Sequence, residues 1–173
     1  MELVESGVII GAEKENVNAC SIDITLDDVI MIETSQEQWG IVDLKAKESV
    51  EMQPVKLSET GYHLDPGEFI LASTREVFNL PNDIACEYKL KSTLARNGLD
   101  NALATWCDPG WHNSKLTLEL KNNMRNHQLL LKPGMKIGQI IFYSVAPVPD
   151  RVSYKIRGQY NSQDAVTASK GLR

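Results

Sequence analysis

Short strand-like segments separated by proline–glycine turns constrain the fold of this chain more than any other feature. Proline fixes one backbone angle and glycine reaches the left-handed region, so the pair is typical of tight turns. Three such turns are present: Asp65-Pro66-Gly67, Asp108-Pro109-Gly110 and Lys132-Pro133-Gly134. Apolar or alternating residues predict strands over residues 21–26, 68–72, 116–120 and 136–143. This pattern predicts an all-β fold, a sandwich or barrel-like structure, with few helices.

Length and charge narrow the class of protein further. The 173 residues fit one domain, 1–173, with its own core. Residues 157–173 are polar and rich in small side chains, and taken alone they predict a mobile tail. The net charge of -5, without a block of Lys or Arg, argues against binding to nucleic acid. It does not exclude a single nucleotide held in a local basic pocket.

The sequence favours a cytoplasmic protein that has no membrane partner. Residues 1–11 carry two Glu and no basic segment of the kind that opens a secretory signal. No apolar run approaches the roughly 18 residues that a membrane span needs. The three cysteines, Cys20, Cys86 and Cys107, are odd in number and far apart, so we expect reduced thiols in a reducing compartment.

One short helical turn is expected in the middle of the chain. Ser92 is a suitable N-cap, residues 93–96 suffice for about one turn, and Gly98 suits the left-handed position after it. Backbone N–H groups at a helix start attract phosphate. The residues available there are Lys91, Ser92, Thr93, Leu94, Ala95 and Arg96. The alternative interpretation is a capped surface turn with a solvated arginine, and spacing alone favours it.

Glu119 is the carboxylate whose orientation on a predicted strand the sequence defines best. Leu116, Leu118 and Leu120 alternate with Thr117 and Glu119, so the two polar side chains face away from the leucines. On a solvent-exposed face Glu119 is an ordinary surface residue, which is the default. If the face lines a pocket, burial raises the pKa of Glu119 and suits it to proton transfer.

Asp108 and Trp111 flank the second proline–glycine turn. Asp108 is suited either to a hydrogen bond with its own backbone or to a ligand hydroxyl. Trp111 is suited either to packing or to stacking on a base or a sugar.

The histidine and cysteine spacings argue against a zinc-dependent deaminase. Such enzymes need an H-x-E element and a P-C-x-x-C element. His63, His112 and His127 are not followed by glutamate at the second position, and no two cysteines are three apart. The glycine-rich phosphate loop and the dinucleotide fingerprint are also missing from the sequence. We therefore expect no zinc.

Several motifs, in the same order, resemble the dCTP deaminase family of the dCTP deaminase and dUTPase superfamily. They span most of the chain, and an ordered set is far more specific than any one motif. The first is Ser21-Ile22-Asp23-Ile24-Thr25-Leu26, followed by Leu64-Asp65-Pro66-Gly67-Glu68-Phe69, Thr74, Glu76 and Leu80-Pro81. The central ones are Lys91 to Leu99, Asp108-Pro109-Gly110-Trp111 and Leu116 to Asn122. The last are Pro133-Gly134-Met135, Ile137-Gly138-Gln139, Tyr160 and Gln163.

The resemblance implies a fold, an activity and an assembly. It implies a distorted β-barrel or jelly-roll-like subunit of the dUTPase-like, β-clip type, with one or two short helices. It implies deamination of dCTP to dUTP and ammonia, which supplies dUTP and dUMP to pyrimidine metabolism. It further implies a homotrimer with active sites between subunits, and Mg²⁺ bound through the triphosphate rather than by protein ligands.

The resemblance also assigns roles to residues. It makes Glu119 the general acid/base, with Ser92 holding the reacting water and Arg96 orienting the Glu119 carboxylate. Residues 91–96 surround the phosphates and the water. Asp108 contacts the deoxyribose, and the backbone near Thr117 and Leu118 reads the base. The residues that close over the triphosphate from the tail, 157–173, or just before it are Tyr154, Gln159, Tyr160 and Gln163.

The chain departs from the family pattern in several places, and two alternative functions stay open. Residues 100–107 differ from the usual base-reading run, so a modified cytosine stays a possible substrate, and Gln159 stands where a phosphate-contacting lysine is common. One alternative is a dUTPase, or a bifunctional deaminase releasing pyrophosphate, with Asp108 activating the water. The other is a non-catalytic nucleotide-binding regulator on the same fold.

Overall fold

The computed structural model describes residues 2–34, 40–102 and 104–172, so Leu103 of the segment 100–107 and the terminal Arg173 lie outside the described residues. The strands are β1 Ile9–Ile10, β2 Ile22–Thr25, β3 Val29–Glu33, β4 Met52–Lys56, β5 Tyr62–Leu64, β6 Phe69–Asn79, β7 Ile84–Leu90, β8 Leu99–Asn101, β9 Trp106–Cys107, β10 His112–Asn122, β11 Leu129–Leu131 and β12 Lys136–Ser144. The helical segments are α1 Glu2–Glu5, η1 Lys14–Asn16, η2 Leu44–Ala46, α2 Ser92–Ala95, η3 Asp150–Val152 and α3 Tyr154–Arg157.

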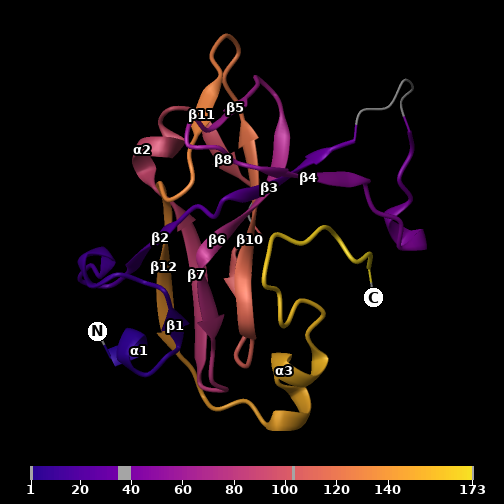
Figure 1. The fold of residues 1–173 in the computed structure, drawn as a ribbon. Coiled ribbons are helices and arrows are strands. Elements are labelled where there is room, and N and C mark those ends of the chain that lie inside the picture. Colours follow the sequence, from indigo (N-terminus) through magenta and orange to yellow (C-terminus); the bar gives the residue numbers. More distant parts are fainter. Residues whose placement is uncertain (1, 35–39, 103, 173) are drawn as a thin grey trace.

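The strands form two main antiparallel sheets, which confirms the all-β prediction. One sheet has the order β4-β3-β6-β10-β8, with β1 also pairing with β6, and the other has the order β2-β12-β7-β9. A small third sheet pairs β11 with β5. The pairings between described residues thus give a distorted sandwich rather than one continuous barrel. Figure 1 shows the long strands β6, β7, β10 and β12 at the centre of the molecule.

The proline–glycine turns act as the sequence predicts. Gly67, Gly110 and Gly134 have φ values of 81°, 87° and 78°, a backbone region that favours glycine over residues with a Cβ atom. The four predicted strands are all present, although β6 runs to Asn79 and β10 runs from His112 to Asn122, beyond their expected bounds. Chain segments outside the apolar alternation therefore also join the sheet.

The leucines of β10 point into the core between the sheets. Leu116, Leu118 and Leu120 are buried, whereas Thr117 and Glu119 are only partly buried. Burial of each leucine stabilises the fold by roughly 2 kcal/mol. Because side chains alternate along a strand, this burial fixes the orientation of Glu119 toward the opposite face.

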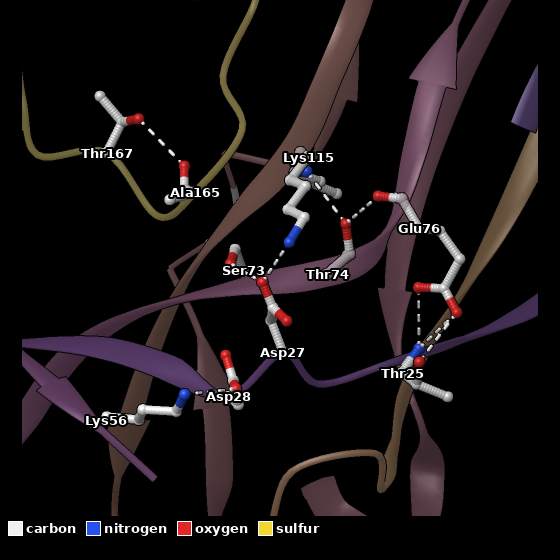
Figure 2. Close-up of polar contacts among 11 residues, drawn as sticks. Thr25, Asp27, Asp28, Lys56, Ser73, Thr74, Glu76, Lys115, Ala165 and Thr167 are labelled. Carbon is white, nitrogen blue, oxygen red and sulfur yellow. Dashed lines mark hydrogen bonds and ion pairs between the residues drawn. The ribbon is translucent and has the colours of Figure 1, made fainter. Parts of the chain in front are cut away.

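The pairing of β6 with β10 is irregular near Glu76. Val77 pairs with Lys115 and Ser73 pairs with Thr117, so three residues of β6 lie opposite one residue of β10. Glu76, buried at this irregularity, accepts hydrogen bonds from the Thr25 amide and hydroxyl at 2.9–3.1 Å (Figure 2). Burial raises the pKa of Glu76, and its bonds tie β2 to β6.

The C-terminal segment packs along β10, in contrast to the mobile tail that composition alone predicts. The Lys115 amide donates to the Gln163 carbonyl at 2.8 Å, and the Ser162 amide donates to the His112 carbonyl at 3.2 Å. Lys115 also forms an ion pair with Asp27 at 2.5 Å (Figure 2). Backbone pairing with β10 therefore supplies order that the polar composition does not reveal.

Candidate active site

A cavity of about 510 Å³ lies over the face of the sheet that carries Glu119. Its wall comes from four parts of the chain: the segment around η2 and β4, the β6 and β10 strands, the segment 104–111, and the C-terminal segment. The lining residues are Leu44, Ser49, Val50, Met52, Phe69, Leu71, Ala104, Trp106, Cys107, Asp108, Trp111, Leu116, Thr117, Glu119, Tyr154, Tyr160, Gln163, Thr167, Ala168 and Ser169. Most of this wall is apolar, and two carboxylates project from it.

Glu119 sits in the cavity with an unused acceptor. Its pairing partner in β6 is Leu71, which also lines the cavity, and its carbonyl accepts from the Ala102 amide. Its Oε2 atom is buried without a hydrogen-bond partner among the described residues. Burial raises the pKa of Glu119, because a low-dielectric setting disfavours the charged form. A carboxyl group in this state is suited to exchange protons with a bound ligand.

Asp108 is placed by the second proline–glycine turn and by a tryptophan. Its Oδ1 atom accepts a hydrogen bond from the Trp106 indole at 2.9 Å. Trp111, three residues later, is buried and stacks on Phe78 with ring centroids 5.3 Å apart. The Trp111 indole donates to the Tyr160 carbonyl at 2.7 Å. Trp111 therefore anchors the C-terminal segment to the cavity wall, with most of its ring used in packing.

The C-terminal residues contribute both contacts and a second unused polar atom. Gln163 is buried, and its backbone N–H donates to the Ser114 hydroxyl at 3.2 Å. Its side-chain Nε2 atom has no partner among the described residues. The Thr167 amide donates to the Thr117 hydroxyl at 3.4 Å. Tyr154 and Tyr160 also line the cavity, and burial raises the pKa of Tyr154. An orphan acceptor and an orphan donor in one cavity fit a polar ligand.

Gln159 and Lys170 do not line the cavity, but they contact each other and other residues of the C-terminal segment. The Gln159 side chain donates to the Gly171 carbonyl at 3.1 Å, and the Lys170 ammonium donates to the Gln159 carbonyl at 3.0 Å. The same ammonium lies 5.3 Å from the centroid of the Tyr160 ring. No Lys or Arg is among the described residues that line the cavity, so Lys170 is a cation held against its wall through Tyr160.

The turn from Lys91 to Arg96 is elsewhere in the subunit. None of its residues lines the cavity; Ser92, Thr93 and Arg96 are exposed. Lys91 forms an ion pair with Asp23 at 2.8 Å. Leu94 is partly buried against the core. A single subunit therefore does not bring these residues together with Glu119.

The structure corrects the expected start of this helix. Lys91, not Ser92, occupies the N-cap position, and no side chain caps the turn. The reason is that the Lys91 amide still pairs with the Ile137 carbonyl, so extended backbone continues to Lys91 and Ser92 is already helical. Gly98 adopts the predicted left-handed conformation, with φ of 85°.

Comparison with known proteins gives the family. A sequence model described as dCTP deaminase-like matches residues 2–145. The chain belongs to the dCTP deaminase-like family. It is 32% identical over 163 residues to a protein of Corynebacterium glutamicum named "dCTP deaminase, dUMP-forming", covering 91% of this chain and 84% of that one. A protein of the same name from a Nocardioides species is 36% identical over 157 residues, covering 88% of this chain and 81% of that one.

Solved structures of the dCTP deaminase-like family and its relatives share the fold. The 2'-deoxycytidine 5'-triphosphate deaminase of Agrobacterium tumefaciens matches with a TM-score of 0.63 at 19% identity, over 82% of this chain and 44% of that longer chain. A dUTPase variant from phage phi11 of S. aureus matches with a TM-score of 0.50 at 14% identity, over 82% of this chain and 86% of that one. These matches confirm the predicted dUTPase-like architecture.

Trp106 and Lys170 are absent from the residues that the sequence singles out. Trp106 stands two residues before Asp108, and an aromatic residue beside a polar turn was the only signal available. Lys170 has no local motif. No local sequence pattern marks the apolar wall residues Phe69, Leu71 and Val50, because only the fold brings them into the same cavity as Glu119. Leu118, expected near the base, points into the core and leaves only its backbone available.

The described residues contain neither a protein metal centre nor a membrane helix. Within 2–34, 40–102 and 104–172, no group of three or more His, Cys, Asp or Glu is placed to hold a metal ion. The cavity offers two carboxylates, Asp108 and Glu119. Over the same ranges, no helix is long and apolar enough to cross a bilayer.

Proposed function

We propose that this protein deaminates dCTP by hydrolysis, with Glu119 as the general acid/base. The observation that carries the proposal is the partly buried Glu119 carboxyl, with Oε2 unpartnered, in a largely apolar cavity. Burial raises its pKa, which brings the group closer to the pH at which it both accepts and returns a proton. The relatives that match over most of the chain are named dCTP deaminases.

In the proposed reaction, Glu119 carries every proton transfer. Water adds to C4 of cytosine while Glu119 takes its proton and passes it to the ring nitrogen N3. The proton of the new hydroxyl then moves through Glu119 to the amino group, which leaves as ammonia. The C4 carbonyl of uracil forms as the carbon–nitrogen bond breaks. Acid–base help of this kind contributes about 10² to 10⁴ in rate, and exclusion of water adds to it.

For the rest of the nucleotide, we propose the contacts that the family resemblance implies. Asp108 accepts a hydrogen bond from the deoxyribose, and the backbone at Thr117 and Leu118 reads the base. Trp111 closes the sugar side of the cavity. The residues that close over the triphosphate are Tyr154, Gln159, Tyr160 and Gln163. Mg²⁺ travels with the nucleotide and shields its phosphate charge, since Mg²⁺ prefers phosphate oxygens and retains much of its water shell.

The turn from Lys91 to Arg96 enters the site from a second copy of the chain. This part of the proposal follows from two features: the turn is exposed, and it does not line its own subunit's cavity. A homotrimer with sites between subunits then supplies Ser92 to hold the water and Arg96 to orient the Glu119 carboxylate. Lys91 and Thr93, with the helix start, face the phosphates.

A second candidate is a bifunctional enzyme that releases dUMP and pyrophosphate. The names of the relatives, which describe them as dUMP-forming, favour it. In that reaction a water activated by Asp108, which lines the same cavity, attacks the α-phosphate. The difference is visible in the products: dUTP and ammonia in one case, dUMP, ammonia and pyrophosphate in the other.

The decisive experiment incubates the purified protein with Mg²⁺ and dCTP. Ammonia is measured, and nucleotides are separated by chromatography. We expect Glu119→Gln to retain dCTP binding, measured by calorimetry, and to lose turnover. A Glu119→Gln protein with near-normal deamination contradicts the mechanism. Binding of dCTP by the wild-type protein with no turnover of dCTP or dUTP instead supports a non-catalytic regulator.

A further inference from the structure

Trp106 is an exposed aromatic residue with a specific polar contact. Its side chain is 54% exposed and lines the cavity. An indole ring offers both a large apolar surface and one N–H donor. Its indole N–H donates to the Asp108 Oδ1 atom at 2.9 Å. This is the hydrogen bond that the structure gives to the Asp108 carboxylate.

Strand pairing and a neighbouring aromatic ring restrain the indole of Trp106. Trp106 lies in β9, where its pairing partner in β7 is Glu87. The Tyr143 ring packs against it, with centroids 5.7 Å apart and planes at 41°. Strand pairing and a neighbouring ring therefore fix the direction in which the indole N–H points.

A fixed donor constrains the carboxylate that accepts from it. With Oδ1 bonded to the indole, rotation of the Asp108 side chain is restricted, and its second oxygen stays available as an acceptor. Asp108 shares the cavity with Glu119. The sugar of dCTP carries one free hydroxyl, at the 3' carbon, and this group is the natural donor to that oxygen.

We propose that Trp106 is a positioning residue that aims Asp108 at the 3'-hydroxyl of the bound deoxynucleotide. The proposal rests on the proposed function, because it takes a cytosine deoxynucleotide as the ligand. It assigns to Trp106 a part in affinity for the sugar, exerted through Asp108 rather than through the reacting atoms. Loss of the indole N–H frees the carboxylate to rotate away from the sugar.

The test uses Trp106→Phe, which keeps an aromatic ring and removes the donor. KM and kcat are measured for dCTP and for 2',3'-dideoxycytidine triphosphate, which lacks the 3'-hydroxyl. Dissociation constants of both nucleotides are measured by calorimetry with Mg²⁺. We expect dCTP to bind about tenfold more weakly, a loss of the size that one hydrogen bond to a charged group supports. The dideoxy nucleotide changes by less than about twofold on the same reasoning, and kcat is retained.

The matched control is Tyr143→Phe, which keeps the ring that packs on Trp106 and removes only the hydroxyl bonded to Glu87. We expect it to bind both nucleotides as the wild type does. Equal losses for the two nucleotides in Trp106→Phe, or no loss for either, overturn the proposal. If the wild-type protein binds dCTP but does not deaminate it, the proposed reaction fails while the binding comparison still decides the role of Trp106.

Discussion

The cavity around Glu119 and the turn from Lys91 to Arg96 have opposite physical characters. Glu119 is partly buried beside apolar residues, and one of its oxygens has no hydrogen-bond partner in the described part of the chain. The turn is short and exposed, and its lysine is paired with Asp23. Figure 1 shows α2 and the C-terminal segment on opposite sides of β10 in that view. A single chain therefore separates Glu119, which is suited to proton transfer, from the turn, whose residues are suited to binding phosphate.

The separation has a clear physical advantage. Burial away from water raises the pKa of a carboxyl group, whereas an arginine and two hydroxyls without protein partners are stable only where water reaches them. The proposed site, completed by a second copy of the chain and a nucleotide, would satisfy both requirements.

The largest expected effect comes from mixing two inactive variants. Arg96→Ala and Glu119→Gln each lose turnover, by about 10² or more for the acid/base group. If each site takes Glu119 from one subunit and Arg96 from another, a refolded equal mixture regains up to about a quarter of wild-type activity, by random assembly of the subunits. Ammonia release from dCTP measures the recovery.

A mixture that stays inactive although both proteins co-assemble would show that Arg96 and Glu119 act within one chain. The control is a mixture of Glu119→Gln with itself, taken through the same refolding. Co-assembly is checked by a size tag on one variant.

The second largest expected effect is on the pH dependence of kcat/KM. Burial raises the pKa of Glu119, and the proposed base must be ionised to accept a proton from water. The rate constant kcat/KM therefore falls on the acid side, about tenfold for each pH unit below the pKa, with a midpoint above the ordinary value of about 4.3. Leu71→Asn, which brings a polar group beside Glu119, should move the midpoint toward lower pH. An unchanged midpoint in a folded Leu71→Asn protein contradicts burial as the cause.

The smallest expected effect concerns Lys170, the cation held against the cavity wall through Tyr160. Lys170→Met should raise KM for dCTP by about twofold to fivefold, as expected for loss of one exposed charge that attracts a phosphate chain. Deoxycytidine, which has no phosphate, should bind both proteins equally. Lys132→Met, an exposed lysine of the third proline–glycine turn, is the control. Equal weakening of deoxycytidine binding would show that Lys170 supports the fold of the C-terminal segment instead.

Local patterns predict much of the fold but little of the cavity wall. The alternation around Glu119 and the three proline–glycine turns are properties of neighbouring residues, and they reappear in the structure. The three-residue irregularity in β6 contains Glu76, which contacts Thr25, 51 residues earlier. The pairing of Gln163 with Lys115 is likewise non-local. Contacts of this range leave no periodic trace in the sequence.

The sequence by itself determined the all-β class, the family-like order of motifs, and the orientation of Glu119 away from its leucines. Each of these follows from side-chain alternation, turn chemistry or motif order along the chain. Only the tertiary structure decided that this face is covered by the C-terminal segment, and that Trp106 bonds to Asp108. It alone also separated Arg96 from Glu119. Burial and distance arise from packing of remote segments, so they appear only when the chain is folded.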